Sequence, residues 1–436
     1  MGSNHVAAWM TAFHFRIFIS LKTCRLENGI RIIHHSSPTN VAYCGMAIDA
    51  GTRDEREGEY GIAHFCEHML FKGTTHRRSW HILNRMEAVG GDLNAYTNKE
   101  ETVVYTAFMK DHLHRAVNLI SDIVFHSTFP QHELDKEAEV VVEEIESYND
   151  SPAELIFDEF EDMLFEGHEL GHDILGKIED VRGYRSEDLQ QFVNRMYRPE
   201  RMVFFVFGDY EFNEVRRTIE KETSFLKPID DDTQENKGKA EVLVREKAEM
   251  EYVATHRTVV RDTHQAHVML GCRAYPSSDK RRVALYFLNN ILGGPGMNSL
   301  LNVALREHKG LVYTVESSLT NYTDTATFSI YFGCDPQDVE KCLRTVRKEL
   351  NKLMSTPLSN SKFSACMKQI KGQIGVSCDN FENYALDMAK SFLHYNKFEG
   401  VKETFAQLDT LTPEMVQAVA KDLFKPERLS LLVYNR

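Results

Sequence analysis

Two histidines four residues apart, His64 and His68, stand in the sequence with Glu67 directly before the second one. On a helix, residues four apart lie one above the other, and Glu67 shares their side of the cylinder. A neutral imidazole binds zinc readily, and a catalytic zinc ion takes three protein ligands and keeps a fourth position for water. Residues 61–74 therefore predict two ligands of a Zn²⁺ site and a proton acceptor, and a third ligand must lie elsewhere in the chain.

The order His-x-x-Glu-His is the inverted form of the commoner His-Glu-x-x-His zinc helix. The chain contains 19 histidines, so the motif by itself is a hypothesis. The alternative interpretation is a surface helix that carries two solvated histidines. Cys66 points away from the ligand side of this helix, and we expect it to be a small residue facing the core.

The third ligand is predicted on a helix over residues 131–149, whose two faces differ. At about 100° per residue, one narrow stripe holds Glu137, Val140, Val141, Glu144 and Tyr148. The far side holds Lys136, Glu139, Glu143, Glu146 and Asp150. Carboxylates on an apolar stripe need an explanation, whereas charges that face water do not. Glu144 is therefore the natural third ligand, and Glu137 could orient or tune the site without binding the metal. Glu143 is the competing assignment.

Length and composition restrict the kind of protein. A chain of 436 residues suits two or more domains, and 42% hydrophobic and 27% charged residues are ordinary for a soluble globular protein. Eight cysteines without close pairs favour a reducing, cytoplasmic compartment. No stretch approaches the roughly 20 apolar residues of a membrane span. The net charge of −14 argues against nucleic acid and is compatible with basic peptide substrates, although a solvated acidic surface explains it equally well.

The first part of the chain is predicted to begin with strands. Residues 1–23 are expected to be a poorly structured leader, part of which need not be native. The Asn-Gly pair at residues 28–29 is the signal of a hairpin, and residues 41–50 are predicted as a further strand. His34 and His35 follow a strand end, and we expect them to be solvated rather than metal ligands.

A pair of glycines, Gly90 and Gly91, ends a short helix predicted over residues 80–89. An extended segment with Asn94 and Ala95 follows. Paired glycines beside a strand allow another backbone to approach closely, as when a peptide adds itself to the edge of a sheet. An ordinary hairpin loop explains the same pattern, and the sequence leaves both interpretations open.

The chain contains an internal repeat. Residues 186–207 align without gaps on residues 413–434, at an offset of 227 residues. Each copy is predicted as a helix that leads through Pro-Glu-Arg into a buried strand, so the chain consists of two homologous halves. A polar run at residues 230–239 is typical of an exposed linker between them. We expect an N-terminal zinc-binding domain over 24–229, a linker over 230–245 and a C-terminal domain without the zinc motif over 246–436.

The zinc residues together resemble the pitrilysin, or insulinase-type, family of zinc peptidases, in its half-length form. The match runs over nearly all of the chain from about residue 24 onward. It implies that His64, His68 and Glu144 bind the metal, that Glu67 is the general base, and that Glu137 is the family's accessory glutamate. The implied fold is α+β: two homologous domains, each a mixed and mostly antiparallel sheet packed with helices on one face.

The resemblance also assigns residues outside the zinc motif. Gly91, Asn94 and Ala95 lie in a segment that resembles the edge strand receiving the substrate backbone. Arg306 and Tyr313 match an arginine and tyrosine pair that helps to bind substrate and to stabilise the oxyanion. A guanidinium and a phenol are good donors to a carbonyl oxygen and to the charge that develops on it. Without the resemblance, a surface arginine and a core tyrosine would explain the pair.

Full-length members of the family carry four such domains, whereas two are predicted here. In the family, the arginine and tyrosine face the zinc domain across a closed clamshell, so the resemblance implies a second subunit. Because one sequence carries both Glu67 and the Arg306 and Tyr313 pair, we expect a homodimer with two composite sites. A heterodimer with a related subunit is the alternative.

These observations predict a zinc endopeptidase that holds one Zn²⁺ per chain and hydrolyses unfolded peptides inside a closed dimer chamber. We expect neither nucleic acid nor a membrane among its partners. One rival is a non-catalytic scaffold with the same fold, and the presence of every ligand and of the base counts against it. A metal-dependent protein that binds peptides without cleaving them is the other rival.

Overall fold

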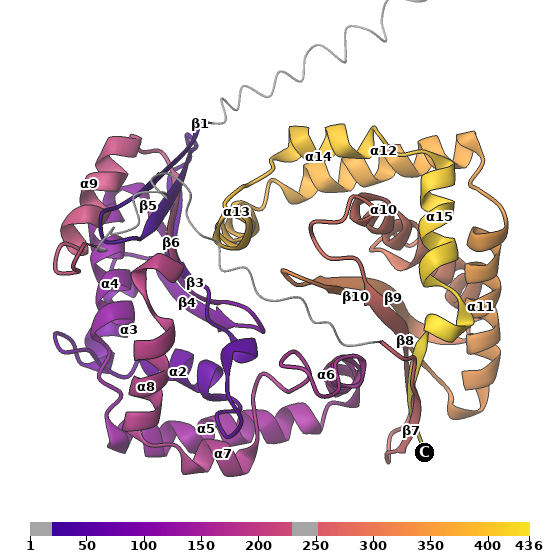
Figure 1. Cartoon of the computed structure of the whole chain (residues 1–436), viewed down its shortest axis with the longest axis horizontal. Coiled ribbons are helices and arrows are strands. Elements are labelled where there is room, and N and C mark those ends of the chain that lie inside the picture. Colours follow the sequence, from indigo (N-terminus) through magenta and orange to yellow (C-terminus); the bar gives the residue numbers. More distant parts are fainter. Residues whose placement is uncertain (1–19, 229–251) are drawn as a thin grey trace, which may run out of the picture.

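The fold is described for residues 20–228 and 252–436 in a computed structural model. The linker expected over residues 230–245, and residues 1–19 of the expected leader, lie outside the described residues. Figure 1 shows two halves side by side, the earlier residues in indigo to magenta and the later ones in orange to yellow. Each half is built around one sheet.

The first sheet has six strands. In spatial order they are β1 (Ser20–Arg25), β2 (Arg31–Ser36), β6 (Met202–Gly208), β3 (Val41–Ile48), β5 (Thr102–Met109) and β4 (Asp92–Thr97). Only β2 and β6 run parallel. In the turn before β2, Asn28 accepts a hydrogen bond from the backbone of Ile30, and Gly29 has a φ of 97°, which favours glycine. The sheet begins at Ser20, inside the region expected to be a leader.

Helices cover one face of the first sheet. They are α2 (Ile62–Leu70), α3 (Ser79–Glu87), α4 (Leu113–His126), α5 (Gln131–Asn149), α7 (Ile178–Gly183), α8 (Ser186–Met196) and α9 (Phe212–Glu222). A core containing Met46, Phe65 and Phe204 forms between these helices and the strands. α2 packs against β4, α5 and α8. Burial of its apolar side in this core therefore fixes the helix that carries the two histidines of the motif.

The second sheet has five strands. In spatial order they are β7 (His256–Val260), β11 (Ser430–Asn435), β8 (Ala266–Ala274), β10 (Ala326–Cys334) and β9 (Val312–Asn321). Only β7 and β11 run parallel. The helices of this half are α10 (Arg282–Gly293), a π-helical turn (Asn302–Glu307), α11 (Val339–Ser355), α12 (Asn360–Ser377), α13 (Phe381–Tyr395), α14 (Val401–Leu408) and α15 (Pro413–Leu423).

The two halves repeat the same topology. α8 begins at Ser186 and α15 at Pro413, and each is followed by a 3₁₀ turn, Pro199–Arg201 or Pro426–Arg428, and then by a strand. The strand order β2-β6-β3-β5-β4 of the first sheet returns as β7-β11-β8-β10-β9 in the second, with the parallel pair in the same place. The mixed, mostly antiparallel sheets agree with the predicted fold class.

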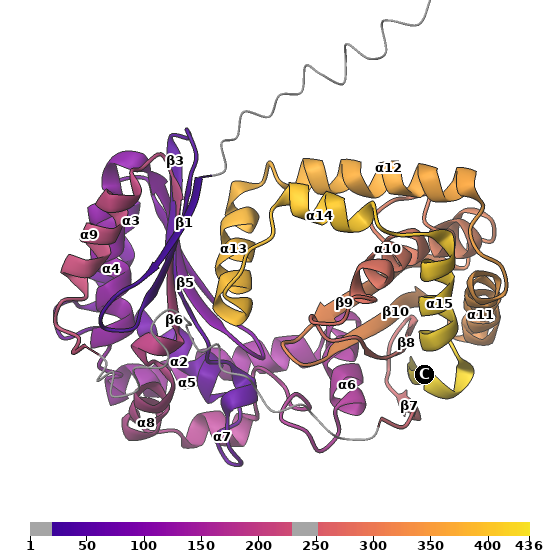
Figure 2. The ribbon, with the colours of Figure 1, turned by 45° about the horizontal axis from the view of Figure 1, so that its top comes forward.

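The second face of the first sheet is covered by α13, which comes from the other half of the chain. Met388 and Phe392 of α13 pack among Ile33, Val203 and Phe205. Figure 2 shows α13 standing beside this sheet, opposite the other helices. Helices on one face only were expected, and this expectation was wrong. It could not be corrected from the sequence, because a contact between distant halves leaves no periodic signal within one domain.

α6 (Pro152–Leu164) makes the reciprocal contact with the second sheet. Phe160 and Leu164 of α6 pack with Met269, Leu432 and Tyr434. In Figure 2, α6 lies next to β8, within the orange half. Each half therefore contributes one helix that packs against the sheet of the other half.

His34 and His35 are buried, at 1% and 4% exposure, so the expectation that they are solvated was wrong. The two ring nitrogens of His34 lie 3.0 Å from the backbone oxygens of Val206 and Tyr210. His35 packs against the ring of Phe207, and burial lowers its pKa to about 4. They lie at the end of β2, which neighbouring elements enclose on both faces.

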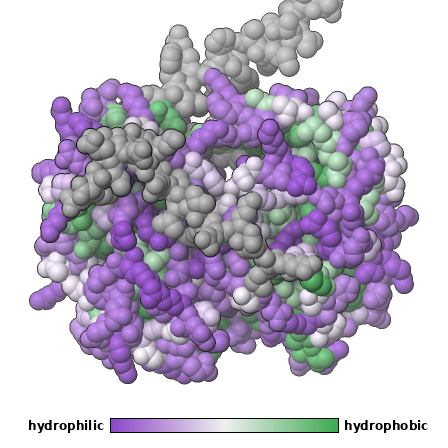
Figure 3. Space-filling view, viewed as in Figure 1, coloured by the Kyte–Doolittle hydropathy of each residue, from purple (hydrophilic) through white to green (hydrophobic). Residues whose placement is uncertain are grey.

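On the face seen in Figure 3, hydrophilic residues dominate and hydrophobic ones form small separate groups. No helix among the described residues is long and apolar enough to cross a membrane.

Candidate metal centre

The N-terminus of α2 is fixed by a buried carboxylate. Glu55 accepts hydrogen bonds from the backbone N–H groups of Gly61, at 3.0 Å, and Ala63, at 2.9 Å. Its Oε2 also lies 3.0 Å from Nε2 of His172. These contacts satisfy amides that a helix leaves unpaired in its first turn. Glu55 was not singled out from the sequence, although a negative charge just ahead of a helix start is a signal that could have revealed this role.

α5 brings Glu144 to the two histidines of α2. One carboxylate oxygen of Glu144 lies 3.9 Å from Nε2 of His64, and the other lies 3.5 Å from Nε2 of His68. One potential ligand atom from each residue lies within 4.8 Å of the others. Two ligands of a tetrahedral zinc ion with bonds of about 2.0–2.1 Å are about 3.3–3.5 Å apart. These side chains therefore fit a zinc ion, and we name this group the candidate metal centre.

Glu137 holds His68 from the side away from Glu144. Oε1 of Glu137 lies 3.1 Å from Nδ1 of His68, and its Oε2 lies 2.5 Å from Nζ of Lys72. A carboxylate at Nδ1 fixes the ring and leaves Nε2 for a metal. Lys72 was not singled out from the sequence, because a lysine shortly after the motif carries no spacing signal.

The pKa values of the two histidines are shifted in opposite directions. Burial and the neighbouring His68 lower the pKa of His64 to about 3. Burial also acts to lower the pKa of His68, but the hydrogen bond with Glu137 and the charges of Glu67 and Glu144 raise it overall. Zinc binds neutral imidazole, so the lowered pKa of His64 keeps its ring in the form that binds a metal. The three carboxylates around His68 stabilise positive charge at that position.

Glu67 is 9% exposed, and its Oε2 has no hydrogen-bond partner among the described residues. Burial raises the pKa of Glu67, against the hydrogen bond from Thr97 and the charge of His68. A raised carboxyl pKa brings a group closer to the range in which it can exchange protons near neutral pH. Thr97 ends β4, so this strand contributes to the surroundings of Glu67.

The face of α5 that was calculated from the sequence is only partly the buried one. Glu137 and Val141 are 8% and 0% exposed, but Val140 is 49% exposed. Glu144 lies at the border, with 44% of its side chain accessible. Glu143 is exposed and makes no contact with either histidine of the motif in the described structure. The geometry thus brings Glu144, and not Glu143, to the candidate metal centre.

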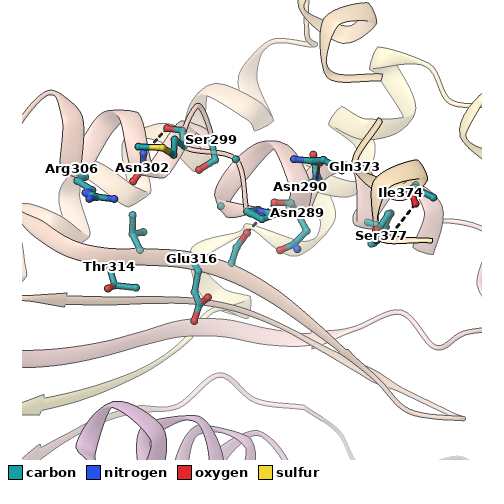
Figure 4. Close-up of a pocket in the computed structure, with 18 of the residues that line it drawn as sticks. Asn289, Asn290, Ser299, Asn302, Arg306, Thr314, Glu316, Gln373, Ile374 and Ser377 are labelled. Atoms are coloured by element: carbon teal, nitrogen blue, oxygen red, sulfur yellow. Dashed lines mark hydrogen bonds between the residues drawn. The ribbon is translucent and has the colours of Figure 1, made fainter. Parts of the chain in front are cut away.

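Arg306 and Tyr313 lie in the second half, around a pocket of about 560 Å³. Figure 4 shows Arg306 at one end of this pocket, close to the strand that carries Thr314 and Glu316. Tyr313 is 82% exposed. No hydrogen bond or ion pair within the described ranges joins either side chain to the candidate metal centre. The side chains of Arg306 and Tyr313 are therefore exposed and form neither hydrogen bonds nor ion pairs with the residues of the zinc motif in the described structure.

The segment with Gly91, Asn94 and Ala95 forms the edge of the first sheet. β4 pairs only with β5 among the described strands, so its other side is open. A Cβ on Gly91 would stand 2.9 Å from the carbonyl oxygen of Ala107 in β5. The backbone that approaches Gly91 closely is thus that of the neighbouring strand β5, which favours the hairpin interpretation for this glycine. The substrate role of Asn94 and Ala95 stays a prediction.

The family matches and a relative at 31% identity define the class of this protein: it belongs to the M16, or insulinase, family of peptidases. Residues 31–177 match the family described as Insulinase (Peptidase family M16). Residues 185–370 match the Peptidase M16 inactive domain. The second match begins one residue before α8, which packs with the first sheet, so it runs across the boundary between the two halves.

Relatives that match most of this chain carry protease or peptidase names. An uncharacterized zinc protease of Bacillus subtilis is 31% identical over 417 residues, which are 95% of this chain and 98% of the relative. The beta subunit of mitochondrial-processing peptidase from Rattus norvegicus is 30% identical over 91% of this chain and 80% of its own. A protease structure from Helicobacter pylori superposes with a TM-score of 0.86 at 22% identity, over 95% of this chain and 99% of that one.

Proposed function

We propose that this protein is a zinc-dependent endopeptidase that cleaves unfolded peptides. The observation that carries the proposal is the convergence of His64, His68 and Glu144, whose ligand atoms lie within 4.8 Å of one another beside the buried Glu67. Two imidazoles and one carboxylate are a ligand set that catalytic zinc takes in proteins. Family membership adds to this, because relatives are named zinc proteases.

The chemistry divides between a metal and the side chains around it. A zinc ion in such a site supplies Lewis acidity, which polarises a carbonyl and lowers the pKa of a water molecule to near neutral. Glu67 would take the proton of the attacking water and later give a proton to the leaving amine. Glu137, hydrogen-bonded to Nδ1 of His68, would keep that ring in the orientation that a ligand needs.

An extended peptide can add to the open side of β4. Because this strand pairs on one side only, the backbone groups of Asn94 and Ala95 are placed to bind a peptide as an additional strand. Gly91 begins this segment. The net charge of −14 makes basic peptides a candidate preference. Digestion of a peptide library without enrichment for Arg or Lys around the cleaved bond would remove the preference for basic peptides.

A second subunit would complete the site, and we propose a homodimer that encloses the substrate in a chamber. Arg306 and Tyr313 are exposed and free of side-chain hydrogen bonds within the described ranges, as donors awaiting a partner would be. Mixing Glu67→Gln chains with Arg306→Ala/Tyr313→Phe chains tests this. Random mixing of two inactive parents should restore about a quarter of the activity if sites are shared. No restoration would exclude shared sites and leave the peptidase proposal intact.

The peptidase proposal itself is tested by digesting an unstructured peptide and mapping the fragments by mass spectrometry. The wild-type chain should cleave it, and Glu67→Gln should lose at least about 100-fold in rate while it keeps its zinc. Glu146→Gln, an exposed residue of α5, is the matched control and should cleave normally. Bound zinc with equal, negligible cleavage by all three proteins would favour a peptide-binding or scaffold role instead.

A further inference from the structure

A second cluster of metal-ligating side chains lies outside the candidate metal centre. It consists of His76, in the loop after α2, and of Asp122 and His126, four residues apart on α4. One ligand atom from each of the three lies within 4.8 Å of the others. In the described part of the chain, this cluster and the candidate metal centre are the two groups with such geometry.

Asp122 is held so that one of its oxygens is directed to the histidines. Its Oδ2 accepts a hydrogen bond of 2.8 Å from Thr74 and a further one from Arg77. Its Oδ1 accepts a hydrogen bond of 2.6 Å from Nδ1 of His76, which the ring would give up on binding a metal, and lies 3.7 Å from Nδ1 of His126. A carboxylate that binds a metal through one oxygen is commonly fixed through the other in this way.

His126 has a ring nitrogen without a partner. Nδ1 of His126 is shielded from water and makes no hydrogen bond in the described structure. The distance of 3.7 Å to Asp122 is too long for a hydrogen bond but close to the separation of about 3.3–3.5 Å between two ligands of one zinc ion. The ring of Phe225 packs 4.6 Å from that of His126 and limits how far it can turn.

We propose that His76, Asp122 and His126 form a second Zn²⁺ site, distinct from the candidate metal centre in every ligand. Two imidazoles and one carboxylate suit zinc among the common divalent metals. The side chain of His76 is 58% exposed, so a fourth position faces solvent and the ion can exchange. The positive charge of Arg77 on the far oxygen of Asp122 weakens the site relative to one without it.

A cation bound there would fasten the loop of residues 71–78 to the end of α4. The loop already makes backbone contacts with this region, including a hydrogen bond of 2.9 Å from Thr75 to His126. The same loop carries Lys72, which contacts Glu137, the residue behind His68. The second site is therefore placed to stiffen a segment that supports the candidate metal centre.

The test separates the two sites by removing the first. In a His64→Ala/His68→Ala chain, dialysis against zinc followed by elemental analysis should still find one zinc ion per chain, and zinc should raise the thermal midpoint. Adding His76→Ala or His126→Ala should weaken zinc binding by more than about 100-fold. Loss of a residue that only hydrogen-bonds to a ligand typically weakens it by about 10–100-fold. The readout is metal content and is independent of peptidase activity.

His132→Ala in the same background is the matched control. His132 is 72% exposed and lies 3.2 Å from Glu133, so it is a surface histidine beside one carboxylate without a third ligand. This control should keep the zinc. Absence of zinc from the background chain, or equal loss in the His76, His126 and His132 variants, would overturn the proposal. If His126→Ala fails to fold, the more exposed His76→Ala decides.

Discussion

Arg53 and Asp324 are 271 residues apart in the sequence and are joined by two hydrogen bonds of 2.7 Å, one from each terminal nitrogen of the guanidinium group. Arg53 lies in the 3₁₀ turn Thr52–Asp54 ahead of α2, and Asp324 lies between β9 and β10. Their side chains are 1% and 6% exposed. The pair is therefore shielded from water and fastens the approach to α2 onto the second half of the molecule.

Asp324→Ala should lower the free energy of unfolding by about 2–3 kcal/mol, because it leaves Arg53 buried with fewer partners. Contacts with Glu100 and Glu169 remain and limit the loss. Urea titration measures the change. Asp279→Ala is the matched control, since its partner Arg281 has a side chain that is 56% exposed, and it should cost less than about 1 kcal/mol. Equal losses in the two variants would show that burial gives the Arg53 pair no additional strength.

Glu55→Ala should destabilise the start of α2. The backbone N–H groups of Gly61 and Ala63 would lose their acceptor in a buried position, at a cost of about 2–3 kcal/mol. Thermal or urea unfolding measures this, and hydrogen exchange of the α2 amides should rise. Glu57→Ala, in the same loop but exposed, should change stability by no more than about 0.5 kcal/mol. Unchanged exchange in α2 would argue against a capping role for Glu55.

Local signals in the sequence were sufficient for several elements of the fold. The helix predicted over residues 131–149 is α5 (Gln131–Asn149), because the contrast between its two faces extends over its whole length. The repeat was also visible, since α8 and α15 each lead through the same Pro-Glu-Arg turn into a strand. For the candidate site, the inverted motif needed only the four-residue spacing of His64 and His68.

What the sequence left out depends on contacts between distant segments. His34 and His35 were expected to follow a strand end and to be solvated, but β2 continues to Ser36 and segments far along the chain enclose them. The exchange of α6 and α13 between the sheets has no local pattern. Val140 was placed on the buried stripe of α5, yet it is exposed. Helical periodicity predicts which side of a helix is buried, but not how wide the surface is that neighbouring elements cover.

Glu144→Gln and Glu143→Gln compare adjacent residues of α5. Glu144 faces Nε2 of His64 and His68 at 3.9 and 3.5 Å, whereas Glu143 does not belong to either metal-ligating group of the described residues. The Glu144 variant should bind zinc at the candidate centre more than about 100-fold more weakly, and the Glu143 variant should bind it normally. Competition with a chelator measures both affinities. The opposite result would return the ligand role to Glu143.

Cys66 should resist thiol reagents in the folded protein. Its side chain is 0% exposed on the core side of α2, and burial raises the pKa of the thiol, so little of it is in the reactive thiolate form. Mass spectrometry after brief alkylation should find Cys66 unmodified in the native state and modified after unfolding. Cys24 and Cys378, which are only partly buried, should react before Cys66. Native labelling of Cys66 at the rate of Cys378 would mean that α2 opens readily.

Glu101 joins the first half of the molecule to α13. Its carboxylate lies 2.8 Å from Nε2 of His394 and 2.7 Å from Nζ of Lys390, and its side chain is 1% exposed. Burial acts to raise the pKa of Glu101, but the hydrogen bond with His394 and the charge of Lys390 lower it to about 2, from an ordinary value of 4.5. The folded state therefore binds the proton of Glu101 less readily than the unfolded state does.

This difference makes the junction sensitive to acid. A carboxyl group with a lowered folded pKa stabilises the protein fully above about pH 4.5, and the contribution, about 3 kcal/mol, is lost as the pH falls towards 2. Glu101→Gln should thus be less stable than the wild type near pH 7, and the gap should close in acid. Urea unfolding between pH 7 and 3 measures it. Glu139→Gln, which removes a solvent-exposed partner of Arg182, should show almost no gap at any pH. A gap for Glu101→Gln that stays constant down to pH 3 would mean that packing, and not the charge of Glu101, holds α13 against the first sheet.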